Sequence, residues 1–95
     1  MYARVVRWEG AEAQAMRDSA ARIDAEDKPP EGIPDNSRFL MLLDPDNGRG
    51  LAIGLFASEE DRRTADAVLS AMDPPGDGMG KRVSVEMYEL AVEKP

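Results

Sequence analysis

The chain of 95 residues carries 12 basic and 19 acidic side chains, for a formal net charge of −7, and it contains no cysteine and no histidine. Without cysteine there are no disulfides, thiolate metal sites or cysteine nucleophiles, and without histidine the commonest general base and metal ligand are missing. The negative charge opposes phosphate backbones and anionic lipid surfaces, so neither nucleic acid nor membrane is an expected partner.

The length predicts a single domain spanning residues 1–95, with one core that buries roughly 60–65% of the surface of the unfolded chain. The sequence has no apolar stretch of about 18 residues and no basic N-terminal segment followed by an apolar run. We therefore expect a soluble, cytoplasmic protein with no metal and no bound cofactor.

The first predicted elements are a strand, a helix and a long connection. Residues Tyr2 to Trp8 interleave valine and aromatic residues with polar ones, which is typical of a strand. Residues Ala11 to Ile23 form an alanine-rich segment with an apolar stripe at helical spacing, made of Ala13, Met16, Ala20 and Ile23. The segment from Asp24 to Asn36 contains prolines and clustered charges, so it is a connection and not a second domain.

Two apolar segments follow, Phe39 to Leu43 and Leu51 to Ala57, and each is typical of a short strand. The residues between them resemble the start of a calcium loop. A calcium loop that begins at Asp44 lacks the oxygen ligand, glycine and glutamate needed at its fifth, sixth and twelfth positions. The segment instead predicts a hairpin turn, with Asn47 and Gly48 at positive φ.

The second helix is predicted to start at Ser58, whose hydroxyl can cap it and which is followed by acidic residues that favour its positive end. The proline- and glycine-containing run from Asp73 to Gly78 is expected to stop this helix. Residues Arg82 to Val92 again have a strand pattern. The buried stripe of the helix is predicted to contain Ala65, Val68, Leu69 and Met72.

This order predicts an α+β, ferredoxin-like β-α-β-β-α-β domain with both helices on one face of an antiparallel sheet. The segments Phe39 to Leu43 and Leu51 to Phe56 are apolar on both faces, although helices can cover only one. A large exposed apolar patch is unusual in a monomer. We therefore expect a second sheet to cover it, in a homodimer that forms an α+β barrel.

The element order, the Asp-x-Asp-Asn-Gly hairpin and the segment Leu55 to Glu60 resemble the antibiotic biosynthesis monooxygenase (ABM) superfamily of dimeric α+β barrels. The resemblance covers Tyr2 to about Val92. It places Phe56 where many relatives have a pocket-facing tryptophan. The branch that degrades haem uses a strand asparagine and a histidine ligand, and this chain has neither at the matching places, so haem chemistry is not expected.

If Phe56 faces the pocket, the two-residue period of a strand puts Ala52 and Gly54 on the same side and leaves volume there. The candidate ligand-binding residues are Arg4, Trp8, Phe56 and Tyr88, and the candidate catalytic residues are Glu86, Arg4 and Tyr88. Two interpretations remain: an ion pair between Arg4 and Glu86 with aromatic residues filling space, or a cavity that holds a flat ligand.

Three functions are compatible with these residues. The first is a homodimer that binds a small apolar or aromatic ligand in its barrel. The second is a cofactor-independent monooxygenase acting on an aromatic or polyketide-like substrate, with Glu86 as proton acceptor and Arg4 as oxyanion partner. The third is a noncatalytic interaction module that uses the acidic surface.

Overall fold

The structure is a computed structural model that describes residues 1–72 and 77–95. The described residues form an α+β domain with the predicted ferredoxin-like order of strands and helices. The elements are β1 (Tyr2–Glu9), α1 (Ala13–Asp24), β2 (Arg38–Asp44), the 3₁₀ turn η1 (Pro45–Asn47), β3 (Arg49–Phe56), α2 (Glu59–Ala71), the 3₁₀ turn η2 (Asp77–Met79) and β4 (Lys81–Glu89).

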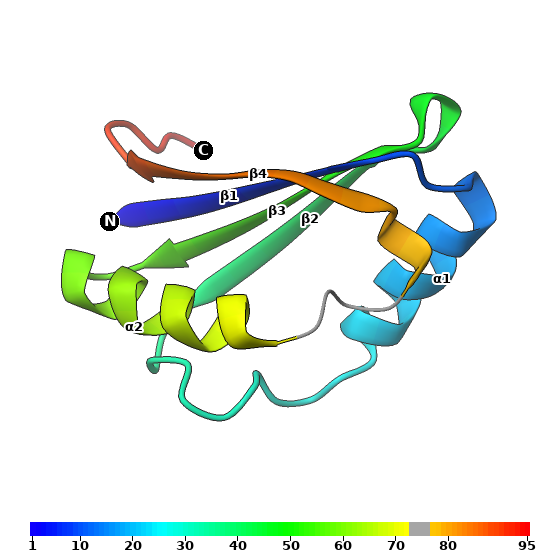
Figure 1. Cartoon of the computed structure of the whole chain (residues 1–95). Coiled ribbons are helices and arrows are strands. Elements are labelled where there is room, and N and C mark those ends of the chain that lie inside the picture. Colours follow the sequence, from blue (N-terminus) through cyan, green and yellow to red (C-terminus); the bar gives the residue numbers. More distant parts are fainter. Residues whose placement is uncertain (73–76) are drawn as a thin grey trace.

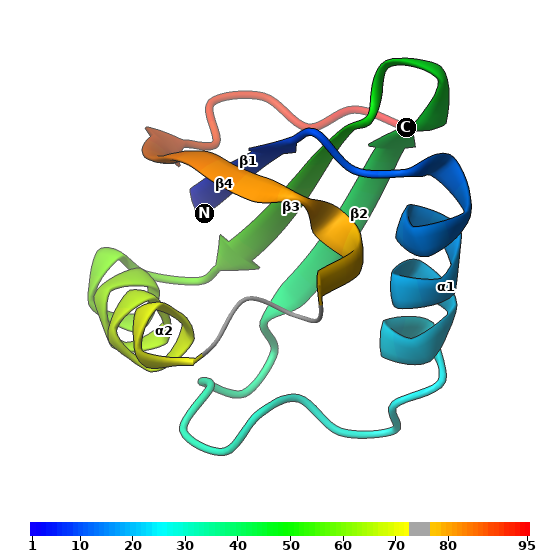
Figure 2. The same cartoon turned by 45° about the vertical axis from the view of Figure 1, so that its right-hand side comes forward.

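The four strands form one antiparallel sheet in the order β2-β3-β1-β4. Both helices lie on the same side of this sheet, which we call the covered face; the other side, which carries no helix of residues 1–72 and 77–95, we call the open face (Figure 1). Along the sheet, α1 lies beside one end and α2 beside the other, as the turned view also shows (Figure 2). This arrangement confirms the predicted fold class.

The strand register decides which residues share a face. Val5 of β1 lies between Ile53 of β3 and Glu86 of β4, so these residues and their second neighbours belong to the open face. Arg4 lies between Gly54 and Met87 on the covered face. The pairing of β1 with β4 shifts between Arg7 and Trp8, which marks a β-bulge near the start of β4.

The hairpin between β2 and β3 confirms the predicted turn. Gly48 closes it in the left-handed region, with φ of 64°. Asn47 does not have the predicted positive φ; it belongs to η1, and its side-chain amide donates to Oδ2 of Asp44 at 2.9 Å. Arg49 donates to the same oxygen through Nε and Nη2. The Asp44 carboxylate therefore stabilises the turn by accepting hydrogen bonds from Asn47 and Arg49.

Helix α2 begins as predicted, because the backbone N–H of Asp61 donates to the hydroxyl of Ser58 at 3.1 Å. It ends at Ala71, and residues 73–76 of the predicted stop signal lie outside the described residues. Met72 was predicted to be in the buried stripe, but it is 45% exposed because it lies after the last helical turn. Ala65 of the same stripe is fully buried.

The main core lies between the sheet and α1. Val6 and Trp8 of β1 pack there with Met16 of α1 and Met79 of η2, and both methionines are fully buried. Gly50 of β3 makes room for them: a Cβ atom at this position would lie 2.7 Å from the Met79 side chain and 3.3 Å from that of Met16. The large side chains that fill the core above Gly50 therefore come from α1 and η2 and not from β3.

The chain after β4 runs along the open side of the sheet (Figure 1). The N–H of Leu90 donates to the carbonyl of Met1, and Glu93 forms an ion pair with Arg38 of β2 at 3.4 Å. Ala3 and Leu55, neighbours in the open face at this end of the sheet, are each only 7% exposed. On β2 and β3 the exposed apolar side chains of the open face thus lie nearer the hairpin, while Tyr88 of β4 is 48% exposed beside Ala3.

Candidate functional site

The five residues predicted to form one ligand-binding wall lie on two different faces of the sheet. Arg4, Trp8 and Phe56 belong to the covered face and are 5%, 5% and 0% exposed, so their side chains point away from the open face. Glu86 and Tyr88 belong to the open face, opposite Val5 and Ala3 of β1. The predicted wall therefore does not form, because the register places Glu86 beside Val5 and not beside Arg4.

The predicted contact between Arg4 and Glu86 is wrong for the same reason. Arg4 donates through Nε to Oδ1 of Asp66 in α2 at 2.8 Å, and through Nη2 to the Ser70 hydroxyl at 3.4 Å. The Arg4 side chain is 6% exposed and that of Asp66 is 37% exposed. This largely buried pair attaches α2 to the central strand β1, so Arg4 has a structural partner of its own.

The volume expected beside Ala52 and Gly54 is not an empty pocket. A Cβ atom on Gly54 would lie 2.7 Å from the ring of Phe56 and 3.3 Å from that of Phe39. These two rings meet edge to face, with centroids 6.0 Å apart. Aromatic side chains of the sheet itself thus fill the space left by the glycine.

The open face carries a polar cluster that joins β1 and β4, made of Arg7, Glu86 and Tyr88, which we call the open-face cluster. Arg7 Nε donates to Oε1 of Glu86 at 2.5 Å, and the Tyr88 hydroxyl donates to Oε2 at 2.9 Å. Hydrogen bonds from Arg7 and then Tyr88 lower the pKa of Glu86 below its usual value. The Glu86 carboxylate, which accepts the hydrogen bond from the Tyr88 hydroxyl, raises the pKa of Tyr88.

These shifts define what the cluster can do chemically. A carboxylate with a lowered pKa and both oxygens occupied is a weak proton acceptor, so Glu86 is poorly suited to be the general base of an oxygenase. Tyr88 stays protonated and keeps its proton directed at Glu86. The cluster is better suited to hydrogen bonding than to removing a proton from a substrate.

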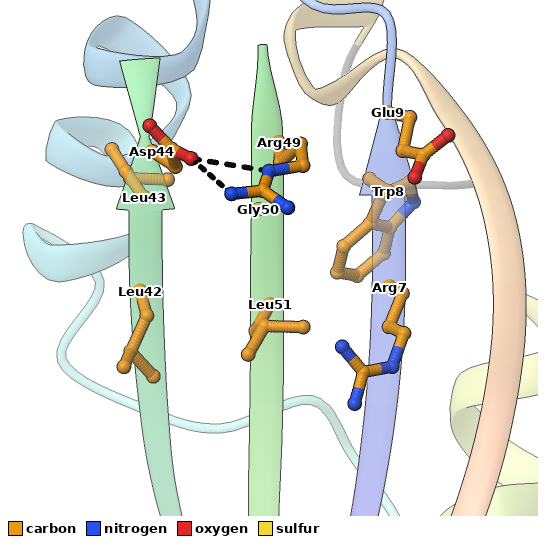
Figure 3. Close-up of a pocket in the computed structure, with 9 residues that line it drawn as sticks. All are labelled: Arg7, Trp8, Glu9, Leu42, Leu43, Asp44, Arg49, Gly50 and Leu51. Atoms are coloured by element: carbon orange, nitrogen blue, oxygen red, sulfur yellow. Dashed lines mark hydrogen bonds and ion pairs between the residues drawn. The ribbon is translucent and has the colours of Figure 1, made fainter. Parts of the chain in front are cut away.

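A hollow of about 270 Å³ lies beside this cluster, at the hairpin end of β1, β2 and β3 (Figure 3). Leu42 and Leu51 are neighbours in the open-face register and supply its apolar floor. Arg7 borders it on one side, and the Asp44–Arg49 pair lies at the end of β2 and β3. Trp8, Glu9, Leu43 and Gly50 complete the lining.

Arg7, Leu42 and Leu51 were not among the predicted site residues. One signal in the sequence could have found Arg7: it lies at an odd position of β1, as do Ala3 and Val5 of the open face. The alternation of side chains gives the face of Arg7 but not its neighbour on β4. Placing Arg7 next to Glu86 also requires the β1–β4 register, which is a property of the tertiary structure.

Comparison with protein-family models, curated proteins and solved structures finds no match for this chain. The fold assignment therefore rests on the chain's own topology. Within residues 1–72 and 77–95, no group of three or more acidic side chains is placed to hold a metal ion. No helix in that part of the chain is long and apolar enough to cross a membrane.

Proposed function

We propose that two copies of this chain pair through their open faces and bind a small apolar or aromatic ligand between the sheets, as in an ABM-like dimeric α+β barrel. The observation that carries this proposal is the apolar surface left without a helix. Leu40 and Leu42 are 43% and 47% exposed there, next to half-buried Leu51 and Ile53. Burying each exposed leucine would contribute roughly 1 kcal/mol.

The charges of the open face favour a second copy of the same chain as the partner. Most of them occur in three ion pairs, Arg7–Glu86, Arg49–Asp44 and Arg38–Glu93, whereas Glu9 has no ion pair among the described residues. The three pairs cancel, so most of the net charge of −7 resides on the rest of the molecule. Two identical chains therefore repel least when they approach through their open faces.

Ligand binding is preferred to oxygenase turnover because of the open-face cluster. Arg7 holds the pKa of Glu86 low, which removes the best candidate for a proton acceptor. The family resemblance supports the dimeric barrel through the element order and the hairpin. The resemblance does not identify another residue on the open face that could act as a proton acceptor.

Sedimentation equilibrium at micromolar concentration tests the dimer and should give twice the chain mass of 10.4 kDa. Leu42→Asp places a charge in the proposed interface and should shift the equilibrium to monomer. Val85→Asp is the matched control, because Val85 is 39% exposed but pairs with Val6 on the other face. A folded wild-type monomer, or equal weakening by both variants, would contradict the proposal.

A further inference from the structure

We propose that the ligand of the open face is a planar aromatic monocarboxylate, with its ring over Leu42 and Leu51 and its carboxylate on the guanidinium of Arg7. The inference rests on the proposed homodimer, because the second sheet would close the open side of the hollow. It adds a ligand class and a recognising residue to that proposal.

Arg7 is positioned to bind an acceptor. Arg7 donates through Nε to Glu86, which fixes the guanidinium, and the Tyr88 hydroxyl lies beside it; the terminal amino groups make no other hydrogen bond among the described residues. Arg7 borders the hollow, and its guanidinium extends toward β3 on the side of Leu51 (Figure 3). A planar pair of N–H donors matches the two oxygens of a carboxylate.

Arg49 lies at the end of the hollow, where its charge is paired with Asp44. It uses Nε and Nη2 on a single oxygen of Asp44, at 3.1 and 2.6 Å. The carboxylates of Asp44 and Glu86 are thus each neutralised by an arginine. Glu9 also lines the hollow and has no ion pair among the described residues, so each further acidic group on the ligand would meet added repulsion. A single carboxylate, held by directed hydrogen bonds, is therefore expected rather than a dicarboxylate.

The rest of the hollow selects an apolar ring. Leu42 is 47% exposed and Leu51 is half-buried, and they lie side by side in the register of β2 and β3. A volume of about 270 Å³ accommodates one or two fused rings and little more. A flat ring also fits between two facing sheets, which pack about 10 Å apart.

Isothermal titration calorimetry of the full chain with 1-naphthoate and its neutral analogue 1-naphthamide tests the inference. We expect saturable binding of 1-naphthoate, and binding of 1-naphthamide weaker by about tenfold or more. Arg7→Gln should abolish this preference without unfolding the chain, because the Arg7 side chain is 49% exposed. Arg38→Gln is the matched control: it breaks another open-face ion pair but does not line the hollow.

The outcomes separate this inference from the proposed function. Equal affinity for the two probes, or equal losses in Arg7→Gln and Arg38→Gln, would overturn carboxylate recognition and leave the aromatic-binding homodimer in place. Failure of both probes to bind would overturn the inference together with the ligand part of the proposed function. The dimer is judged independently by sedimentation.

Discussion

The two faces of the sheet differ most clearly along β3. Its covered face carries Gly50, Ala52 and Gly54 before Phe56, whereas its open face carries Leu51, Ile53 and Leu55. On the covered face, bulky side chains from α1, η2 and neighbouring strands occupy the space above the small residues. On the open face the strand supplies its own bulk. Small strand residues therefore mark the side where other elements pack.

The ion pairs of the two faces differ in the same way. Arg4 on the covered face is almost completely buried beneath α2 and pairs with Asp66. Arg7 of β1, on the open face, is 49% exposed and pairs with Glu86 of the neighbouring strand β4. The first pair attaches a helix to the sheet, and the second leaves donor groups at the surface. Substitutions on the two faces should thus have different consequences.

The largest difference is expected between Phe56→Ala and Leu40→Ala. Phe56 is fully buried, so its truncation should lower the free energy of unfolding by about 3–5 kcal/mol. Leu40 is 43% exposed, and its truncation should cost far less at concentrations where the chain is monomeric. Urea denaturation of both variants measures the difference. Equal losses would show that the open face is already as well covered as the other.

A smaller effect is expected when the buried ion pair is broken. Asp66→Ala leaves the Arg4 guanidinium without its carboxylate and should destabilise the fold by about 1–3 kcal/mol. Arg63→Ala, which breaks the exposed pair with Glu59 on the same helix, should change stability by about 0.5 kcal/mol or less. Thermal and urea unfolding provide the comparison. If Asp66→Ala is as mild as Arg63→Ala, Arg4 does not depend on its partner.

The smallest effect concerns acid pH and the open-face cluster. The folded-state pKa of Glu86 lies below its ordinary value of 4.5, so its pair with Arg7 stabilises the fold above that pH and is lost as pH falls through the lowered pKa. Glu86→Gln should therefore make the fall in stability between about pH 6 and pH 3 slightly less steep.

The matched variant for this measurement is Arg7→Gln, which removes the other half of the pair. Arg7→Gln should flatten the pH dependence less than Glu86→Gln does, because the Tyr88 hydroxyl still donates to Glu86, and the double substitution should match Glu86→Gln alone. Independent, additive changes would show that the pair is not what lowers the pKa of Glu86.

Local signals in the sequence were sufficient for most of the secondary structure. Ser58 and the acidic residues after it located the start of α2, and Gly48 located the turn between β2 and β3. Capping and turn formation depend on a few adjacent residues, so they can be predicted without knowing the rest of the fold. The element order and the ferredoxin-like class followed from them.

The candidate site could not be predicted in this way. The pattern of β3 is apolar at both odd and even positions, so it does not say which face the helices cover. Grouping Arg4 with Glu86 required a register between β1 and β4 that differs by one residue from the one the structure has. A shift of one residue moves a side chain to the opposite face. This is why Arg7, and not Arg4, is the partner of Glu86.

The sequence by itself determined the elements, their order, the hairpin and the absence of cysteine and histidine chemistry, because each depends on composition or on neighbouring residues. Only the tertiary structure decided that Phe56 and Trp8 belong to the core while Arg7, Glu86 and Leu42 belong to the open face. The physical reason is that side chains alternate along a strand, so the face of each residue is fixed only when the strands pair and the helices pack against one side.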